Sequence, residues 1–146
     1  MTPARRGVAL RGLYFAGLLL WCLVSFLLSC LSDPAESLGV DLHVNDKVEH
    51  ATQYGVGGFL AAGALGGLGG LAPWASGMLF ATLWGASDEF HQSFVEGRDA
   101  DGLDIVADAT GGLLGGLAMT WCFRRAQKAP RQADEGRQGD SSRRPT

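Results

Sequence analysis

The fold is decided by 35 consecutive uncharged residues, 53–87, which read QYGVGGFLAAGALGGLGGLAPWASGMLFATLWGAS. A helix that crosses a bilayer needs about 20 mostly apolar residues, so this stretch is too long for one crossing. It is interrupted by four glycines between Gly66 and Gly70 and then by Pro73. Because proline is tolerated in the first turn of a helix but excluded from its interior, a new helix should begin close to Trp74. The stretch therefore predicts two helices joined by a short turn.

Two further apolar runs lie on either side of this stretch, at residues 12–32 and 103–123. Together the runs predict four membrane spans, at about residues 6–31, 46–68, 74–94 and 103–123. We therefore expect an all-α protein, a four-helix transmembrane bundle, in one domain over residues 1–125. Residues 126–146 are polar and almost free of large apolar side chains, so they predict a disordered tail.

The charges are divided between the ends and the middle of the chain. Ten of the twelve Lys and Arg residues lie at the two ends, whereas twelve of the fifteen Asp and Glu residues and all three His lie within residues 33–108. Basic residues flanking the spans favour the cytoplasmic side, and an even number of spans puts both termini there. The pattern predicts a multi-pass protein of the inner (plasma) membrane, whose main partner is the lipid bilayer and which binds no nucleic acid.

The first span has two other interpretations. A basic start followed by an apolar stretch and small residues also describes a cleavable signal peptide. The sequence Leu27-Leu28-Ser29-Cys30 also resembles a bacterial lipoprotein processing site. Removal of this helix would leave three spans. The two ends of the chain would then lie on opposite sides of the membrane, although the basic residues at both ends favour the cytoplasmic side. The three cysteines, Cys22, Cys30 and Cys122, have neither disulfide nor zinc-site spacing and are interpreted as small packing residues.

Glycine supplies 22 residues of the chain. In lipid, small residues allow helix backbones to approach closely. The spacings Gly63-x-x-x-Gly67, Gly111-x-x-x-Gly115 and Gly112-x-x-x-Gly116 fit this packing. We therefore expect the second and fourth spans to meet through glycine faces. Whether the protein forms homo-oligomers stays open.

Three polar stretches should converge at the outer end of the bundle, because the second span begins there, the third ends there and the fourth begins there. Helical spacing of four places related side chains on one face of each span. Charged groups inside a span are costly and normally face a partner or water. The candidates for catalysis are Asp88, Glu89, His50 and Gln92, and those for binding are Asp46, Lys47, Tyr54, Arg98, Asp104 and Asp108.

The helix dipole separates these acids into two kinds. Asp46 and Asp104 lie near helix starts, where negative charge is favoured, so each could be a cap. Asp88 and Glu89 lie near a helix end, where the dipole opposes them, and they need compensation from a cation, a protonated His or their own protonation. Such a pocket could hold a metal ion, relay protons or bind a cationic or hydroxyl-rich ligand. The plainer alternative is a structural network that joins Arg98 to Asp88 or Glu89.

The polar motifs resemble those of the VanZ-like family of bacterial membrane proteins. The resemblance rests on Asp46-Lys47-x-x-His50-x-x-x-Tyr54, on Asp88-Glu89-x-x-Gln92-x-Phe94-x-x-Gly97-Arg98, and on Asp104, Gly111 and Gly115. It implies an inner-membrane protein of the cell envelope, in a family whose namesake is associated with low-level resistance to the glycopeptide teicoplanin.

Two positions depart from the family pattern, which has Pro in place of Glu96 and Asn in place of Asp108. Asp108 adds a titratable group where the family keeps a neutral amide, so a shared role for this position is in doubt. A family label does not fix chemistry. The resemblance therefore does not make this chain a resistance determinant.

Three functions compete on these grounds. The first, which we favour, is a membrane factor of the cell envelope whose outer pocket binds an amphiphile or a wall-related ligand, with Arg98 holding an anionic head group. The second is a hydrolase or transferase at the membrane interface, with Glu89 or Asp88 as base or metal ligand and His50 as acid/base partner. The third is an ion-coupled transporter. The sequence names no cofactor and leaves metal dependence and enzymatic activity open.

Overall fold

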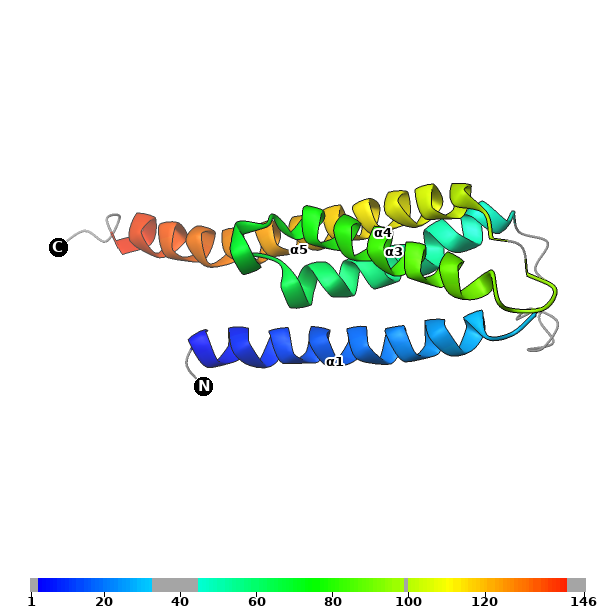
Figure 1. Ribbon diagram of the computed structural model, residues 1–146. Coiled ribbons are helices and arrows are strands. Elements are labelled where there is room, and N and C mark those ends of the chain that lie inside the picture. The colour runs from blue at the N-terminus through cyan, green and yellow to red at the C-terminus, as the bar shows by residue number, and fades with distance from the viewer. Residues whose placement is uncertain (1–2, 33–44, 99, 142–146) are drawn as a thin grey trace.

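The computed structural model describes residues 3–32, 45–98 and 100–141, with side chains from residue 5 to residue 127. Within these ranges the protein is all-helical and contains no strand. The four long helices are α1 (Pro3–Ser29), α3 (Asp46–Leu65), α4 (Pro73–Gln92) and α5 (Gly102–Ser141), and a short 3-10 helix, η1 (Leu68–Gly70), joins α3 to α4. The start of α1 and the end of α5 lie at the same end of the molecule (Figure 1).

The predicted helices agree with the observed ones within a few residues at most ends. The exception is the end of α5, which continues to Ser141, whereas we expected the span to end at residue 123 and disorder to begin at residue 126. The extension contains Ala, Gln and Arg, which are good helix formers, but also Pro130, Gly136 and Gly139, which oppose a helix, so its composition does not explain why α5 continues. The loop acids Asp33, Glu36, Asp41 and Asp99, and also His43, lie outside the described residues.

Two helical segments are long and apolar enough to cross a membrane, namely Arg5–Ser29 and Gly102–Gln127. This conclusion rests on length and composition, and the first segment also has the position of a signal sequence. In α3 and α4, polar residues at one end and many glycines lower the mean hydropathy. By length and composition, α1 and α5 are therefore the two candidate membrane spans, and α3 and α4 do not meet the same test.

The core is a bundle of α3, α4 and α5 whose backbones meet at glycines. A Cβ added at Gly58 would lie 2.5 Å from the Cα of Gly112, and one added at Gly77 would lie 2.6 Å from the carbonyl oxygen of Gly58. Three helices therefore touch through backbone atoms at one level. A Cβ added at Gly115 would collide with the carbonyl oxygen of Gly55, which confirms that the second and fourth predicted spans meet through glycines.

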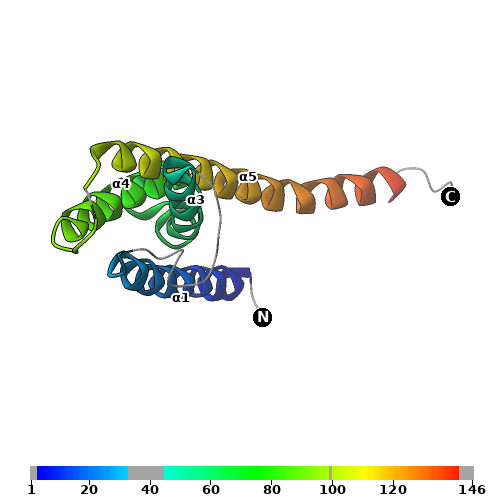
Figure 2. The same cartoon turned by 90° about the vertical axis from the view of Figure 1, so that its right-hand side faces the viewer.

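Helix α1 packs mainly against α3 and lies away from α5 (Figure 2). Trp21 is its main anchor, because its ring meets the edge of Tyr54 at a centroid distance of 5.4 Å and that of Phe80 at 5.9 Å. Gly57 and Gly63 of α3 leave room for Trp21 and Tyr14, respectively. Gly63 therefore lies at the contact of α3 with α1, and not at the contact with α5 that its spacing predicted.

The turn between α3 and α4 forms as the sequence predicts. Gly67 and Gly70 have φ values of 83° and 80°, which side-chain-bearing residues rarely adopt. Pro73 stands in the first turn of α4. Arg11 of α1 donates hydrogen bonds to the carbonyl oxygens of Ala64 (2.9 Å) and Gly66 (2.5 Å), so a side chain from α1 satisfies carbonyls that the end of α3 leaves without helical partners.

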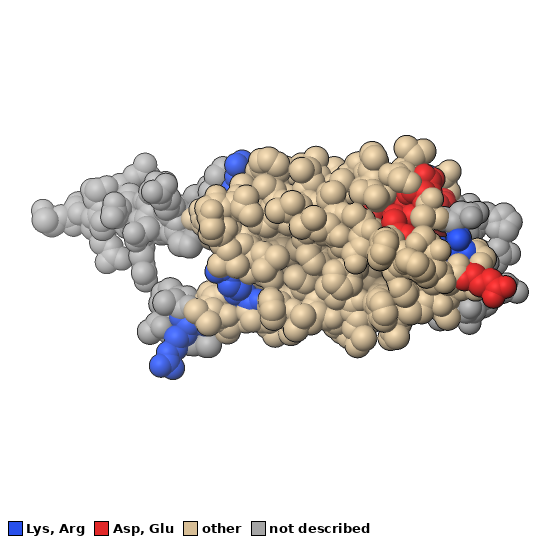
Figure 3. Space-filling model, in the orientation of Figure 1, with Lys and Arg blue, Asp and Glu red and all other residues tan. Residues whose placement is uncertain are grey.

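Charge is separated along the bundle (Figure 3). Acidic residues gather where α3 begins, α4 ends and α5 begins, and we call this region the acidic end. The opposite end carries the basic residues of the first and last helices, Arg5, Arg6, Arg11, Arg124 and Arg125. The middle of the bundle is uncharged, as the sequence requires.

Gly112→Ala should destabilise the bundle, because its Cβ would lie 2.8 Å from the carbonyl oxygen of Gly77 and 3.3 Å from the Cα of Met78. Overpacking of this kind typically costs about 1–3 kcal/mol. The matched control is Gly12→Ala in α1, where nothing lies within 4 Å of the added Cβ. Thermal unfolding in detergent measures both variants, and equal stability would contradict the close backbone contact.

Candidate functional site

The acidic end brings together side chains from α3, α4 and α5. Lys47, in the first turn of α3, donates to Asp101 and Asp104 at 2.5 Å each and to Asp46 at 3.3 Å. Asp101 also accepts the backbone N–H of Leu103 and so caps the start of α5. The Lys47 ammonium, together with this N–H group, lowers the pKa of Asp101 below its ordinary value. These contacts join the starts of two parallel helices.

One turn further along α3, His50 contacts Asp108 of α5. The Nδ1 atom of His50 lies 3.0 Å from Oδ1 of Asp108, and its Nε2 atom lies 4.0 Å from Oδ1 of Asp46. Asp108 is fully buried, and its second oxygen, Oδ2, has no hydrogen-bond partner. Gly85 of α4 makes room for this oxygen, because a Cβ at residue 85 would collide with it.

A second buried network lies another turn deeper. Tyr54, which is 1 % exposed, donates its hydroxyl hydrogen to Oδ2 of Asp88 at 3.0 Å. Gln92 donates to the same oxygen from one turn away on α4, at 3.2 Å. The spacing of four between Asp88 and Gln92 therefore forms the contact that the helix period predicts. Two neutral donors, and no described cation, satisfy the buried Asp88 carboxylate.

Glu89 is also buried, at 5 % exposed, and faces α5. Its Oε2 atom accepts the backbone N–H of Asp101 at 2.7 Å, whereas its Oε1 atom has no hydrogen-bond partner. Its electrostatic neighbours are Asp104, His50 and Asp108. The acidic end thus contains two buried carboxylate oxygens, on Glu89 and Asp108, that no described group pairs.

Arg98 occupies a different place from the one that we predicted. Its Nε atom donates to the carbonyl oxygen of Leu31 at 3.2 Å, so it ties the loop between α4 and α5 to the end of α1. None of the described contacts joins Arg98 to Asp88 or Glu89. A structural role therefore remains for Arg98, but through a backbone carbonyl that sequence reasoning could not identify.

A groove of about 300 Å³ lies where the outer parts of α1 and α4 meet. Its lining consists of four aromatic rings and three polar side chains, from Phe26, Trp84, Ser87, Asp88, Phe90, His91 and Phe94. Beside it, Nε2 of His91 lies 3.5 Å from the sulfur of Cys30. We missed His91 and Cys30 as site residues, because the signal lies in a contact between α1 and α4 that the sequence does not reveal.

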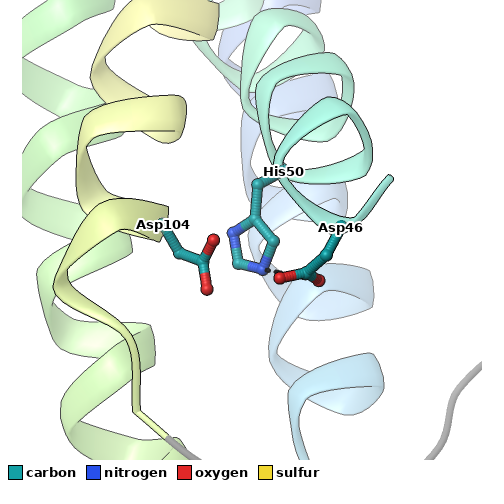
Figure 4. A group of neighbouring side chains, drawn as sticks. All are labelled: Asp46, His50 and Asp104. Carbon is teal, nitrogen blue, oxygen red and sulfur yellow. Dashed lines mark ion pairs between the residues drawn. The ribbon is translucent and has the colours of Figure 1, made fainter. Parts of the chain in front are cut away.

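Asp46, His50 and Asp104 form a group whose potential ligand atoms all lie within 4.8 Å of one another (Figure 4). Asp46 and His50 come from the first two turns of α3, and Asp104 comes from the first turn of α5. In the figure, the imidazole lies between the two carboxylates. Within the described residues, this group therefore has donor atoms close enough together to hold a metal ion.

Nine of the ten predicted site residues therefore lie at the acidic end, where Tyr54, Asp88 and Gln92 form a network separate from the ion pairs of Lys47 and His50, and Arg98 binds the end of α1. Comparison with protein-family models, with curated proteins and with solved structures gives no match to this chain. The resemblance to VanZ-like proteins accordingly stays a prediction. Functional inference therefore rests on the geometry of the acidic end.

Tyr54→Phe should destabilise the protein, because it removes a buried donor from the Asp88 carboxylate. Hydrogen bonds to charged groups are worth about 1.5–3 kcal/mol, so the free energy of unfolding should fall by a similar amount. Tyr14→Phe is the matched control, since Tyr14 packs edge-on against Phe59 and forms no hydrogen bond within the described residues. Denaturation in detergent compares the two variants, and equal losses would show that the Tyr54 hydroxyl contributes nothing.

Proposed function

We propose that this chain is a four-span protein of the bacterial inner membrane, similar to VanZ-like proteins, that binds an amphiphile of the cell envelope at its acidic end. Both termini would be cytoplasmic and the acidic end extracytoplasmic. The separation of basic and acidic residues along the bundle supports this orientation, because basic flanks favour the cytoplasm. The proposal assigns no antibiotic resistance to the chain.

Crossing by α3 and α4 is supported by their place in the bundle. Both helices pack lengthwise against α5, which is itself of membrane-spanning length. The connecting turn lies at the basic end, and the start of α3 and the end of α4 both lie at the acidic end. If α5 crosses the bilayer, its two neighbours share the same depth.

The contacts of α1 with the rest of the bundle indicate that it is not cleaved as a signal peptide. Trp21 packs against aromatic rings of both α3 and α4, and Arg11 caps the end of α3. Gln53 of α3 also donates to Ser25 of α1 at 2.9 Å. Cleavage as a signal peptide would expose Tyr54 and leave carbonyl groups of α3 without these donors. We therefore favour a first span that stays in the mature protein.

Cysteine labelling tests the topology. In a variant with Cys22, Cys30 and Cys122 replaced by serine, a membrane-impermeant maleimide should label Glu96→Cys in intact spheroplasts. It should label Ala126→Cys only after the spheroplasts are opened. Both positions are exposed, so their access depends on the side of the membrane. Labelling of Ala126→Cys in intact spheroplasts would contradict cytoplasmic termini.

The groove between α1 and α4 is the observation that carries the binding function. Ligand sites are typically concave and mostly apolar, with a few polar groups that orient the ligand. Phe26, Phe90, Phe94 and Trp84 would contact a hydrocarbon chain, and Asp88 with His91 would face the head group. Its volume of about 300 Å³ is at the lower end of the range for small-molecule sites.

The polar lining determines which head group fits. Asp88 brings a carboxylate to the groove, and Ser87 and His91 supply further hydrogen-bonding groups. A hydroxyl-rich or cationic head group suits this lining, whereas an anionic one would face repulsion. Arg98 does not line this groove, so the anionic head group that we expected Arg98 to hold is not part of the binding proposed here.

Three amphiphiles with the same dodecyl chain test this proposal: dodecyl maltoside, dodecyltrimethylammonium and dodecyl sulfate. Native mass spectrometry of the protein in nanodiscs should show saturable binding of one or both of the first two and none of the third. Phe90→Ala/Phe94→Ala should weaken this binding about tenfold, the equivalent of ~1.4 kcal/mol. Leu83→Ala, at a position of α4 that is 64 % exposed and lies outside the groove, should not change it. Equal binding of all three amphiphiles would contradict the proposal.

A membrane-interface enzyme is the second candidate. It is favoured by the pairing of His50 with the buried Asp108, because a carboxylate on one ring nitrogen orients the other for acid–base chemistry. Turnover of an envelope amphiphile that His50→Gln abolishes would shift the assignment to this class.

The transporter has less support, since the buried charged residues within the described ranges, Asp88, Glu89, Asp104 and Asp108, all lie at one end of the bundle.

A further inference from the structure

We propose that Asp46, His50 and Asp104 bind a divalent transition-metal ion, with Zn²⁺ the best fit to the three ligands. Their potential ligand atoms already lie within 4.8 Å of one another. In a tetrahedral zinc shell, with bonds of about 2.0–2.2 Å, neighbouring ligand atoms are about 3.3 Å apart. Asp46, whose side chain is 61 % exposed, can rotate toward the ion, and Lys47, which donates to Asp104 at 2.5 Å and to Asp46 at 3.3 Å, would give up these two contacts when the ion binds.

The imidazole of His50 is already oriented for metal binding. Its Nδ1 atom pairs with the fully buried carboxylate of Asp108, which leaves Nε2 facing Asp46. Metal-ligating histidines almost always donate their other N–H group to a carboxylate, a carbonyl or water, because this fixes the tautomer and raises the basicity of the ligand. Asp108 is thus placed as the supporting carboxylate behind a ligating histidine.

The unpaired Oε1 atom of Glu89 is an independent indication of a ligand. Glu89 is 5 % exposed and its Oε1 atom has no hydrogen-bond partner. Buried polar atoms are nearly always paired, and an unpaired charged oxygen is especially costly. Asp104, His50 and Asp108 all act electrostatically on the Glu89 carboxylate. A cation bound beside Asp104 would compensate this charge.

The charge balance also calls for a cation. Asp46, Asp101, Asp104 and Asp108 each bring a carboxylate to Lys47 or to His50. Against them stands the single ammonium of Lys47, which contacts three of the four. A neutral, metal-bound His50 adds no charge. Even with Lys47 present, a divalent ion leaves this group with no excess of positive charge.

The ligand types select the class of ion. Imidazole nitrogen favours Zn²⁺ and similar transition metals, whereas Mg²⁺ and Ca²⁺ favour shells made of oxygen. Three protein ligands also leave a fourth tetrahedral position for water or a substrate group, as in catalytic zinc sites. Asp46 lies at the exposed margin of the group, so an ion can enter from solvent at the acidic end.

Zinc binding to the full-length protein in nanodiscs tests the site. The protein should carry no histidine tag, and titration with Zn²⁺ alone should show one saturable site by calorimetry. Co²⁺ should occupy the same site and give the visible absorption of a tetrahedral complex. Mg²⁺ at the same concentrations should give no binding. Failure of Zn²⁺ to bind saturably would overturn the proposal.

Variants separate this site from adventitious binding. His50→Gln and Asp46→Asn should each weaken Zn²⁺ binding by about 100-fold, and Asp108→Asn, which acts through His50, by about 10- to 100-fold. Glu49→Gln is the matched control, because Glu49 is an exposed acid in the same first turn of α3 and is outside the group. Unchanged affinity in Asp46→Asn, an exposed position that should fold normally, would also overturn the proposal. Amphiphile binding uses different residues and probes, so either proposal can fail without the other.

Discussion

The backbones of α3, α4 and α5 meet at Gly58, Gly77 and Gly112, and the geometry of the acidic end depends on this approach. With helices so close, side chains one to three turns away have little lateral freedom. Those that point inward from three helices must meet. The glycines therefore act at a distance from the polar groups, because they set the helix separation that brings His50 to Asp108 and Tyr54 to Asp88.

The close packing also explains why so much charge is buried in a small protein. An isolated buried carboxylate is unfavourable, and several in one place are more so. The structure divides the compensation among different groups: an ammonium for Asp104, an imidazole for Asp108 and two neutral donors for Asp88. Glu89 receives one backbone N–H group. The incomplete pairing of Glu89 and Asp108 makes this end better suited to binding a ligand than to stabilising the fold alone.

The helices could be predicted well, because apolar runs of about 20 residues and a glycine-rich turn before Pro73 are local signals. The convergence of polar residues could also be predicted, since alternating helix directions and a spacing of four fix the level and the face. Contacts to backbone atoms could not. Arg98 binds the carbonyl oxygen of Leu31, and no side-chain pattern marks such a partner. His91 and Cys30 meet because the end of α1 lies near α4, and no sequence motif marks this contact as the glycine spacings mark the contact of α3 with α5.

The contact between Gly85 and Asp108 has a consequence for how this sequence can diverge. Oδ2 of Asp108 lies in the space that a side chain at residue 85 would need. The two positions should therefore covary: a smaller residue at 108 would permit alanine at 85, and an acid at 108 would require glycine there. A substitution at one of these positions would then favour a matching substitution at the other. Correlated substitutions at 85 and 108 in related chains would therefore identify α4 and α5 as neighbours from sequence alone.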